Sequence, residues 1–252
     1  LIGFPITSTL QGLGAFPGDD NQFIGMLGMH GTYEANNAMH DCDLLINIGA
    51  RFDDRITGKI DEFSPKSKKV HIDIDPSSIN KIIKVDLAIV GDVNEVLKST
   101  IKKINQKQNG IKVSNKQKIS KWWEQIQKWR EKDSLGFINS DKTIKPQHAV
   151  QRLYELTKSQ DTFITTEVGQ HQMWAAQHYK FNKPNRWMTS GGLGTMGYGL
   201  PAAVGVQIAH PDKLVIDIAG EASVLMTMQE MSTAVQYNLP IKILSLIHIS
   251  EP

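Results

Sequence analysis

Cysteine is nearly absent from this sequence, with Cys42 the only one among 252 residues. A single thiol excludes an intrachain disulfide framework and fits a reducing compartment, so we expect a cytoplasmic protein. No apolar run approaches the roughly 20 residues that a helix needs to cross a bilayer, so we expect no membrane partner. The first five residues include neither a starting Met nor the basic region of a signal peptide. We therefore expect an internal cut in a longer chain.

Excess charge is also small, because 28 Lys and Arg nearly balance 26 Asp and Glu. The basic residues concentrate between Lys98 and Lys132, where eleven Lys or Arg accompany two Glu. A basic stretch can indicate nucleic-acid binding, but this one is rich in Gln and Asn, and we expect no nucleic-acid partner. Trp122, Ile126 and Trp129 recur at helical spacing, which predicts an amphipathic helix that packs on a neighbour.

Short apolar runs alternate with helical patterns before this basic connector. The runs Leu44–Ile48, Val70–Ile74 and Leu87–Val90 are each followed by glycine or aspartate. Helical patterns cover Thr32–His40 and Val93–Ile104. Such alternation predicts a parallel sheet covered on both faces, and ligands of such sheets bind at the carboxyl ends of the strands.

A second block of the same kind begins near Pro146, a residue suited to the first turn of a helix. We expect helices at 147–157, 170–177, about 200–210 and 226–236, and strands at 162–166, 214–218 and from 241. The fold class is therefore α/β, with two doubly wound parallel-sheet domains, both incomplete. We place the first domain at 1–108, the basic helical connector at 109–145, the second domain at 146–243 and a non-native tail at 244–252.

A glycine-rich segment in the second block matches a known nucleotide-binding pattern. Gly192, Gly194 and Gly197 form a literal G-x-G-x-x-G, and Asp217 lies 20 residues after the last glycine. Taken alone, this pattern indicates a nicotinamide-dependent dehydrogenase. The stretch that precedes it, residues 186–190, is short and polar, whereas that fingerprint follows an apolar strand. A close-packed glycine turn and a site for another phosphate ligand remain open as alternatives.

Longer motifs are more specific than this glycine box. The second block contains EVGQHQMW at 167–174, SGGLGTMGYGLPAA at 190–203, DIAGEAS at 217–223 and QEMSTA at 229–234. Their order and spacing resemble the diphosphate-binding domain of thiamine-diphosphate enzymes, and specifically that of the acetolactate synthases. In the first block, TLQGLG at 9–14, GMHG at 28–31 and GARFDDR at 49–55 resemble the FAD-binding middle domain of the same family.

The resemblance implies a set of thiamine-diphosphate ligands in the second block. They are Val168, Gly169, Gln170, His171, Gly194, Met196, Gly220, Ala222, Ser223 and Met226. Glu221 stands where the family has an Asp that binds Mg²⁺, and it keeps the hard carboxylate oxygen that this ion prefers. Without the resemblance, His171 is an ordinary polar residue at a helix start and Glu221 is a solvent-facing residue at a turn.

The resemblance also implies a set of FAD contacts in the first block. They are Thr9, Leu10, Leu27, Gly28, Met29, His30, Gly49, Ala50, Arg51, Asp53, Arg55, Asp73, Ile74 and Asp92. Glycines let the backbone approach a flat ligand closely, and arginines neutralise phosphates. Without the resemblance, the charged cluster at 53–55 predicts a network of surface ion pairs.

The function that the resemblance implies is a carboligase. Such an enzyme decarboxylates pyruvate on thiamine diphosphate and joins the two-carbon unit to a second 2-ketoacid, pyruvate or 2-ketobutyrate, in branched-chain amino-acid biosynthesis. The implied cofactors are thiamine diphosphate, Mg²⁺ and FAD. The implied partners are 2-ketoacid substrates, further copies in a homodimer or homotetramer, and a small regulatory subunit, in the bacterial cytoplasm or a plastid.

Parts of the family pattern lie outside this chain. The glutamate that activates the cofactor would precede Leu1, so no catalytic residue is assigned here and we expect the fragment itself to be inactive. His248 stands where the family has a metal-binding Asn, and imidazole is a poor Mg²⁺ ligand, which is why we expect a non-native tail. Alternatives are another thiamine-diphosphate enzyme, such as a glyoxylate carboligase or pyruvate oxidase, and a non-catalytic truncated cofactor-binding module.

Overall fold

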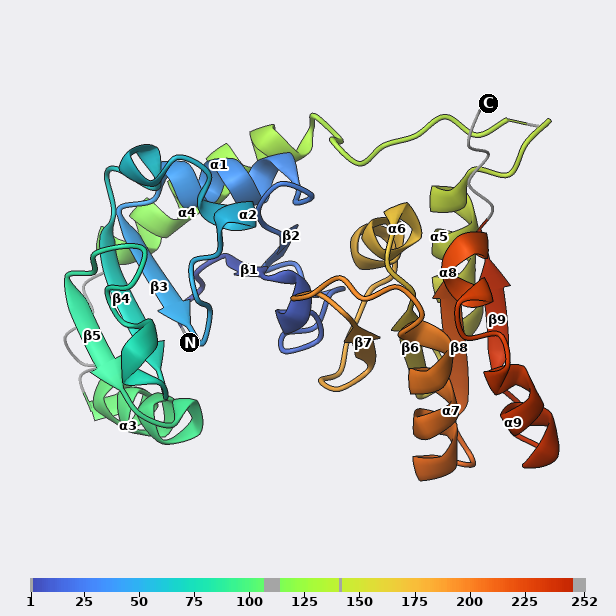
Figure 1. Ribbon diagram of the computed structural model, residues 1–252. Helices are drawn as coiled ribbons and strands as arrows, with labels where there is room; N and C mark the ends of the chain where they lie inside the picture. Colours follow the sequence, from blue (N-terminus) through green and yellow to red (C-terminus); the bar gives the residue numbers. More distant parts are fainter. Residues whose placement is uncertain (1, 107–113, 141, 247–252) are drawn as a thin grey trace. The chain divides into compact units, whose positions relative to one another are not determined.

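The computed structural model describes residues 2–106, 114–140 and 142–246. The chain divides into two compact units, whose elements are labelled in Figure 1. Unit 1 comprises Leu1–Thr7 and Leu27–Ser134, and unit 2 comprises Ser8–Met26 and Leu135–Pro252. Within the described residues, no helix combines the length and the apolar character needed to cross a membrane.

Unit 1 is built on a parallel sheet, as predicted. Its described strands lie in the order β3-β4-β5, with β3 at Leu44–Ile48, β4 at Lys68–Asp73 and β5 at Leu87–Val90. The helices are α1 (Tyr33–Asp41), α2 (Asp54–Thr57), α3 (Val93–Gln106) and α4 (Ser114–Arg130), with short 3₁₀ turns at Ile60–Glu62 and Pro76–Ser78. The short strand β1 (Ile6–Ser8) crosses the boundary between the units in sequence.

The amphipathic helix predicted in the basic connector is confirmed as part of α4. Ile126 is fully buried, and α4 packs on α1. The rings of Trp122 and Trp129 meet edge to face with centroids 5.5 Å apart, and Trp123 Nε1 donates a hydrogen bond of 2.8 Å to the Gly3 carbonyl. The apolar stripe therefore fixes α4 within unit 1, and the charged residues remain on its outer surface.

The sheet of unit 1 is covered less completely than the sequence predicts. Phe52, Phe63 and Ile83 form a buried cluster. Alternate residues of β3 face away from such a cluster, because successive side chains point to opposite faces of a strand. Leu44, Ile46 and Ile48 are accordingly 40–43% exposed. This face of the sheet is therefore covered only in part at β3, although Ile72, which pairs with Ile48, is 5% exposed.

Unit 2 contains a more completely buried parallel sheet, in the order β7-β6-β8-β9. Its strands are β7 (Trp187–Thr189), β6 (Thr162–Thr166), β8 (Leu214–Ala219) and β9 (Lys242–Ser245). The helices are α5 (Pro146–Thr157), α6 (Gln170–His178), α7 (Gly199–Ala209), α8 (Glu221–Leu225) and α9 (Glu230–Gln236). The strand predicted at 162–166 is confirmed.

Helices cover both faces of this sheet. Ile164 and Ile216 belong to a cluster with Val150 of α5, whereas Phe163 and Val215 cluster with Ala203 of α7. Adjacent strand residues point to opposite faces, so these two clusters lie on opposite sides of the sheet. Each fully buried aliphatic side chain contributes roughly 1.5–3 kcal/mol, and the two layers together make unit 2 a well-packed support for the loops at its strand ends.

Two sequence-based expectations for unit 2 are wrong in detail. The helix expected at 226–236 begins only at Glu230, since α9 covers Glu230–Gln236 and residues 226–229 form a turn after the short helix α8. A strand, β7, does precede the glycine-rich segment, because Trp187–Thr189 pairs with β6 despite its short and polar surroundings. Tertiary pairing therefore overrides the weak local preference of these residues.

Residues 8–26 cluster with unit 2, although the sequence places them in a first domain at 1–108. Trp187 Nε1 donates to the Leu10 carbonyl at 3.0 Å, and Gln11 Nε2 donates to the Thr189 carbonyl at 3.0 Å. The segment includes a 3₁₀ turn (Leu10–Gly12) and β2 (Phe23–Met26), and Met26 belongs to the large buried cluster of unit 2. The expected domain boundaries otherwise stay predictions.

The start of the expected non-native tail at 244–252 is part of the fold. β9 runs to Ser245, and the Leu246 N–H donates to the Ala219 carbonyl at 2.8 Å, with Leu246 only 8% exposed. The remainder of that tail, including His248, lies outside the described residues. The expectation that it is non-native therefore stays a prediction.

Candidate functional site

The carboxyl ends of the strands of unit 2 all lie at one edge of the sheet, because the strands are parallel. Three loops leave this edge and lead into helices or extended turns. They follow β6, β7 and β8 and contain the positions expected to bind thiamine diphosphate (Figure 1). The fold therefore gathers these sequence-distant positions at the edge where ligands of such sheets bind.

The loop after β6 requires glycine at position 169. Gly169 has φ +154°, and a Cβ there would lie 2.8 Å from Cε1 of His171. α6 begins at the next residue, Gln170, and a helix N-terminus presents N–H groups to an anion. His171 itself is only 2% exposed, so its ring packs against Gly169 and supports the loop from inside.

The glycine-rich loop after β7 lies against the loop after β6 and against the turn that follows α8. A Cβ on Gly194 would lie 3.8 Å from Val168 Cγ1, and a Cβ on Gly197 would lie 3.3 Å from the Met226 Cβ. Both glycines have positive φ, +67° and +82°. The structure thus places Gly194 beside Val168 and Gly197 beside Met226.

Apolar side chains remain accessible around this contact. Met196 is 39% exposed and Met226 is 55% exposed. Accessible thioethers beside backbone N–H groups suit a ligand that carries both flat rings and an anionic group.

Position 221 offers one carboxylate for a cation. Glu221 is the first residue of α8, directly after Gly220 at the end of β8, and the neighbouring Ser223 hydroxyl donates to the Gly220 carbonyl at 3.2 Å. Among the described residues, no group of three or more His, Cys, Asp or Glu could hold a metal ion. A single carboxylate does fit Mg²⁺, which commonly takes its remaining oxygens from phosphate and water.

Glu167 carries a structural role that the sequence did not reveal. Its side chain is fully buried, and its two oxygens accept the N–H groups of Gly197 at 2.7 Å and Leu200 at 3.1 Å. The only feature that could have indicated this role is that a charged residue directly follows the buried strand β6. The carboxylate ties the loop after β6 to the end of the glycine-rich loop.

Asp217 does not occupy the position that a dinucleotide fingerprint requires. It is fully buried inside β8, where its Oδ1 accepts a 3.0 Å hydrogen bond from the Thr165 hydroxyl. Burial, and secondarily the charge of Glu167, raises the pKa of Asp217 to about 7. A carboxyl group without solvent access is unable to reach a ribose, so the geometry disfavours the dehydrogenase alternative.

In unit 1, the expected FAD positions form two groups. In the first, Gly28 has φ +97°, a Cβ there would lie 2.7 Å from the Arg55 carbonyl, and the Met29 N–H donates to that carbonyl at 2.8 Å. Asn36, which the sequence did not single out, accepts the Gly28 N–H at 2.8 Å and donates to the Gly28 carbonyl at 2.9 Å. Only glycine fits this close approach. Leu27 and His30 flank the pair in sequence.

The second group lies at the carboxyl ends of β3, β4 and β5. The Gly49 N–H donates to the Ile72 carbonyl, and the Gly91 N–H, one residue before Asp92, donates to the Asp73 carbonyl at 2.9 Å. Asp73 is 6% exposed, whereas Ile74 is 69% exposed. Parallel register therefore places these strand ends, including Ala50, along one edge of the sheet.

The charged cluster in unit 1 forms exposed ion pairs. Arg51 binds Asp53 at 2.9 Å and Arg55 binds Asp54 at 2.7 Å, with all four side chains more than half exposed. The surface-network reading is therefore confirmed, although exposed arginines also remain available to a phosphate. Thr9 and Leu10, in contrast, belong to unit 2, where Thr9 caps the 3₁₀ turn.

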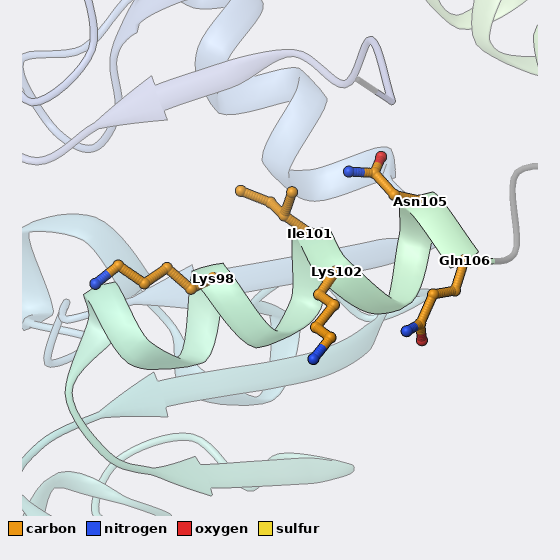
Figure 2. A pocket seen from close by; sticks show the side chains of 5 residues that line it. All are labelled: Lys98, Ile101, Lys102, Asn105 and Gln106. Atoms are coloured by element: carbon orange, nitrogen blue, oxygen red, sulfur yellow. The ribbon is translucent and has the colours of Figure 1, made fainter.

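A surface hollow elsewhere in unit 1 is lined only by residues of α3. Figure 2 shows these side chains along the helix: Lys98, Ile101, Lys102, Asn105 and Gln106. None of them is an expected site residue, and side chains from a single helix do not enclose a ligand. This hollow is therefore not a candidate site.

Comparison with known proteins covers both units. Residues 1–100 match the central domain of thiamine pyrophosphate enzymes, and residues 167–246 match their C-terminal TPP binding domain. Thiamine pyrophosphate, or TPP, is another name for thiamine diphosphate.

Curated relatives match almost the whole chain. The acetolactate synthase large subunit of Haemophilus influenzae is 47% identical over 245 residues, which are 97% of this chain and 42% of that protein. The isozyme 3 large subunit of Escherichia coli is 46% identical, with the same coverage. The chloroplastic acetolactate synthase 1 of Nicotiana tabacum is 46% identical over 98% of this chain and 36% of that protein. The chain thus spans less than half the length of these relatives.

Proposed function

Since the chain belongs to the thiamine pyrophosphate enzymes, we propose that it is the cofactor-binding portion of an acetolactate synthase large subunit. The observation that carries this proposal is that the glycine-rich loop lies against Val168 after β6 and against Met226 after α8, within the residues that match the TPP binding domain. The relatives at 46–47% identity are named as this enzyme. The parent protein would convert pyruvate and a second 2-ketoacid into an acetohydroxyacid for branched-chain amino acids.

The residues at the sheet edge fit thiamine diphosphate. Gly169 lets the ring of His171 pack against the loop after β6, and the N-terminus of α6 would offer N–H groups to the diphosphate. Glu221 would supply a carboxylate oxygen to Mg²⁺, beside Gly220, Ala222 and Ser223. When bound, thiamine diphosphate supplies the electron sink for loss of CO₂ from a 2-ketoacid.

The chain's own contribution is to bind and orient. Met196 and Met226 would pack against the flat rings of the cofactor, because both are accessible and adaptable. His171 would act from inside the loop by supporting Gly169, since its ring is buried. Gln170, at the first position of α6, would stand nearest to the anion.

Unit 1 would bind FAD at its strand ends. The tight pair formed by Gly28 and Met29 with the Arg55 carbonyl, and the edge that carries Gly49, Asp73 and Asp92, support this part of the proposal. Exposed Arg51 would face the phosphates of that cofactor.

The assembly and location are also proposed from the relatives. They are named large subunits, which supports a small regulatory subunit as partner and association into a homodimer or homotetramer. Bacterial and chloroplastic names among them support the bacterial cytoplasm or a plastid.

A chimera would test the proposed activity. Residues 1–246 would replace the matching part of the Haemophilus influenzae large subunit, and acetolactate formation from pyruvate would be measured with thiamine diphosphate, Mg²⁺ and FAD. We expect activity that is lost on Glu221→Ala. A folded chimera that binds thiamine diphosphate but forms another product would assign the chain to a related enzyme, such as a glyoxylate carboligase or pyruvate oxidase.

A further inference from the structure

Glu167 is a buried charged residue outside the set of expected ligand positions. Burying a carboxylate without partners is strongly unfavourable. Here the Gly197 N–H at 2.7 Å and the Leu200 N–H at 3.1 Å each donate to a different oxygen. Both donors belong to the turn that ends the glycine-rich loop and starts α7. The carboxylate therefore serves this turn and does not face a ligand.

The turn is packed tightly against the strand ends. A Cβ on Gly199 would lie 2.3 Å from Asp217 Oδ1 and 2.7 Å from the Glu167 nitrogen. Gly197 has φ +82°, a conformation that side chains disfavour. These contacts therefore restrict the backbone conformation of residues 197–200.

Asp217 shares the same buried space and accepts the Thr165 hydroxyl at 3.0 Å. Two ionised carboxylates in a dry site repel one another. Glu167 has the better hydrogen-bond support of the two, because both of its oxygens accept N–H groups, whereas Asp217 Oδ2 has no hydrogen-bond partner among the described residues.

We propose that Glu167 is a positioning residue for the thiamine-diphosphate site, holding the glycine-rich turn through the N–H groups of Gly197 and Leu200. Met196 directly precedes Gly197, and Gly194 stands against Val168. Fixing Gly197 therefore fixes where Met196 stands relative to the loop after β6. The identity of the ligand rests on the proposed function, whereas the anchoring of the turn does not.

Hydrogen exchange of single amides would test the anchoring in the chain as it exists. Glu167→Gln keeps the size of the side chain but replaces one acceptor oxygen by an N–H₂ group. That group is a donor and would face a backbone N–H, which is also a donor, so one of the two hydrogen bonds is lost. We expect exchange at Gly197 and Leu200 to become about tenfold faster or more, consistent with loss of a charge-assisted hydrogen bond. Thiamine-diphosphate affinity, measured by calorimetry with Mg²⁺, would weaken by about the same factor.

Asp161→Asn provides a matched control. Asp161 directly precedes β6, as Glu167 directly follows it, and its carboxylate binds Arg186 at 2.8 and 3.1 Å at the opposite edge of the sheet. This variant would lower the unfolding temperature but leave exchange at Gly197 and Leu200 and cofactor affinity unchanged. Glu167→Asp, which keeps the charge but is shorter, would give intermediate exchange and stands in if the Gln variant fails to fold.

Unchanged exchange at both amides in Glu167→Gln would overturn the proposal, as would equal acceleration in Asp161→Asn. If the unaltered chain bound no thiamine diphosphate, the proposed function would fail, while the exchange rates would still decide whether Glu167 anchors the turn.

Discussion

The two parallel sheets differ in how far their strands are buried. In unit 2, β6 is buried at every position and β8 at all but its first, whereas β3 of unit 1 alternates between exposed and half-buried residues. In sequence β3 and β8 are mainly apolar, whereas three of the five residues of β6 are threonine. The difference arises from how far they are covered: α5, α6 and α7 cover both faces in unit 2, whereas Leu44, Ile46 and Ile48 of β3 remain 40–43% exposed. The sequence of a strand thus predicts that the strand forms, but it does not predict how completely other elements bury it.

This difference matters for the sites at the strand ends. The loops at the edge of unit 2 rest on a sheet packed from both sides and are tied together by Glu167. The corresponding edge of unit 1 rests on a sheet whose strand β3 leaves Leu44, Ile46 and Ile48 partly exposed. We therefore expect the thiamine-diphosphate loops to be the better ordered of the two sets in this chain.

The largest expected effect compares equivalent aliphatic residues in the two sheets. Ile164 of β6 is fully buried, and Ile46 of β3 is 41% exposed. Ile164→Ala should cost about 2–5 kcal/mol because it leaves a cavity, and Ile46→Ala about 1 kcal/mol or less. Denaturant unfolding of both variants measures these losses. Equal losses would show that the β3 face is covered in solution, for example by a second copy.

The buried Asp217 of unit 2 should make the stability of the chain depend on pH. Asp217 has its pKa raised to about 7 in the folded chain, above the unfolded value near 4. Its contribution to stability is therefore complete below about pH 4 and is lost as the pH rises toward 7. Asp217→Asn should remove this loss and raise the free energy of unfolding above pH 7 by roughly 2–4 kcal/mol. Urea unfolding at pH 5 and pH 8 tests this, and a variant less stable than the parent at pH 8 would contradict it.

A smaller effect concerns the glycines of α7. Gly199→Ala would place a Cβ 2.3 Å from Asp217 Oδ1 and should cost about 1–3 kcal/mol through overpacking. Gly205→Ala meets no atom within 4 Å and should stabilise the helix by about 0.5–1 kcal/mol. Thermal unfolding of the two variants should therefore shift in opposite directions. Shifts of the same sign would mean that tight packing around the turn does not determine the effect of a substitution at position 199.

Much of the local structure was predictable from sequence, and the tertiary contacts were not. The amphipathic part of α4 follows from its apolar spacing, and the strand at 162–166 was predicted although only Phe163 and Ile164 in it are apolar. The placement of residues 8–26 in unit 2 depends on hydrogen bonds such as that from Trp187 to the Leu10 carbonyl, between residues 177 positions apart. No local pattern encodes such a partner.

The candidate site shows the same division. Motif resemblance named Val168, Gly194 and Met226, of which the structure places Gly194 beside Val168. It gave no role to Glu167, because a carboxylate at a strand end usually faces solvent or a ligand. Glu167 is identified as a residue that holds the loop, and not one that binds a ligand, only by its burial and by the two backbone N–H groups that donate to it.

The most direct test of the central claim is titration calorimetry of this chain with thiamine diphosphate in the presence of Mg²⁺. Gly169→Ala and Gly28→Ala are matched variants, one in each unit, because each adds a Cβ within 2.8 Å of a neighbouring atom. We expect binding at one site, which Gly169→Ala abolishes and Gly28→Ala leaves intact. Absence of binding in the unaltered chain, or equal loss in both variants, would contradict the assignment of the site to the strand ends of unit 2.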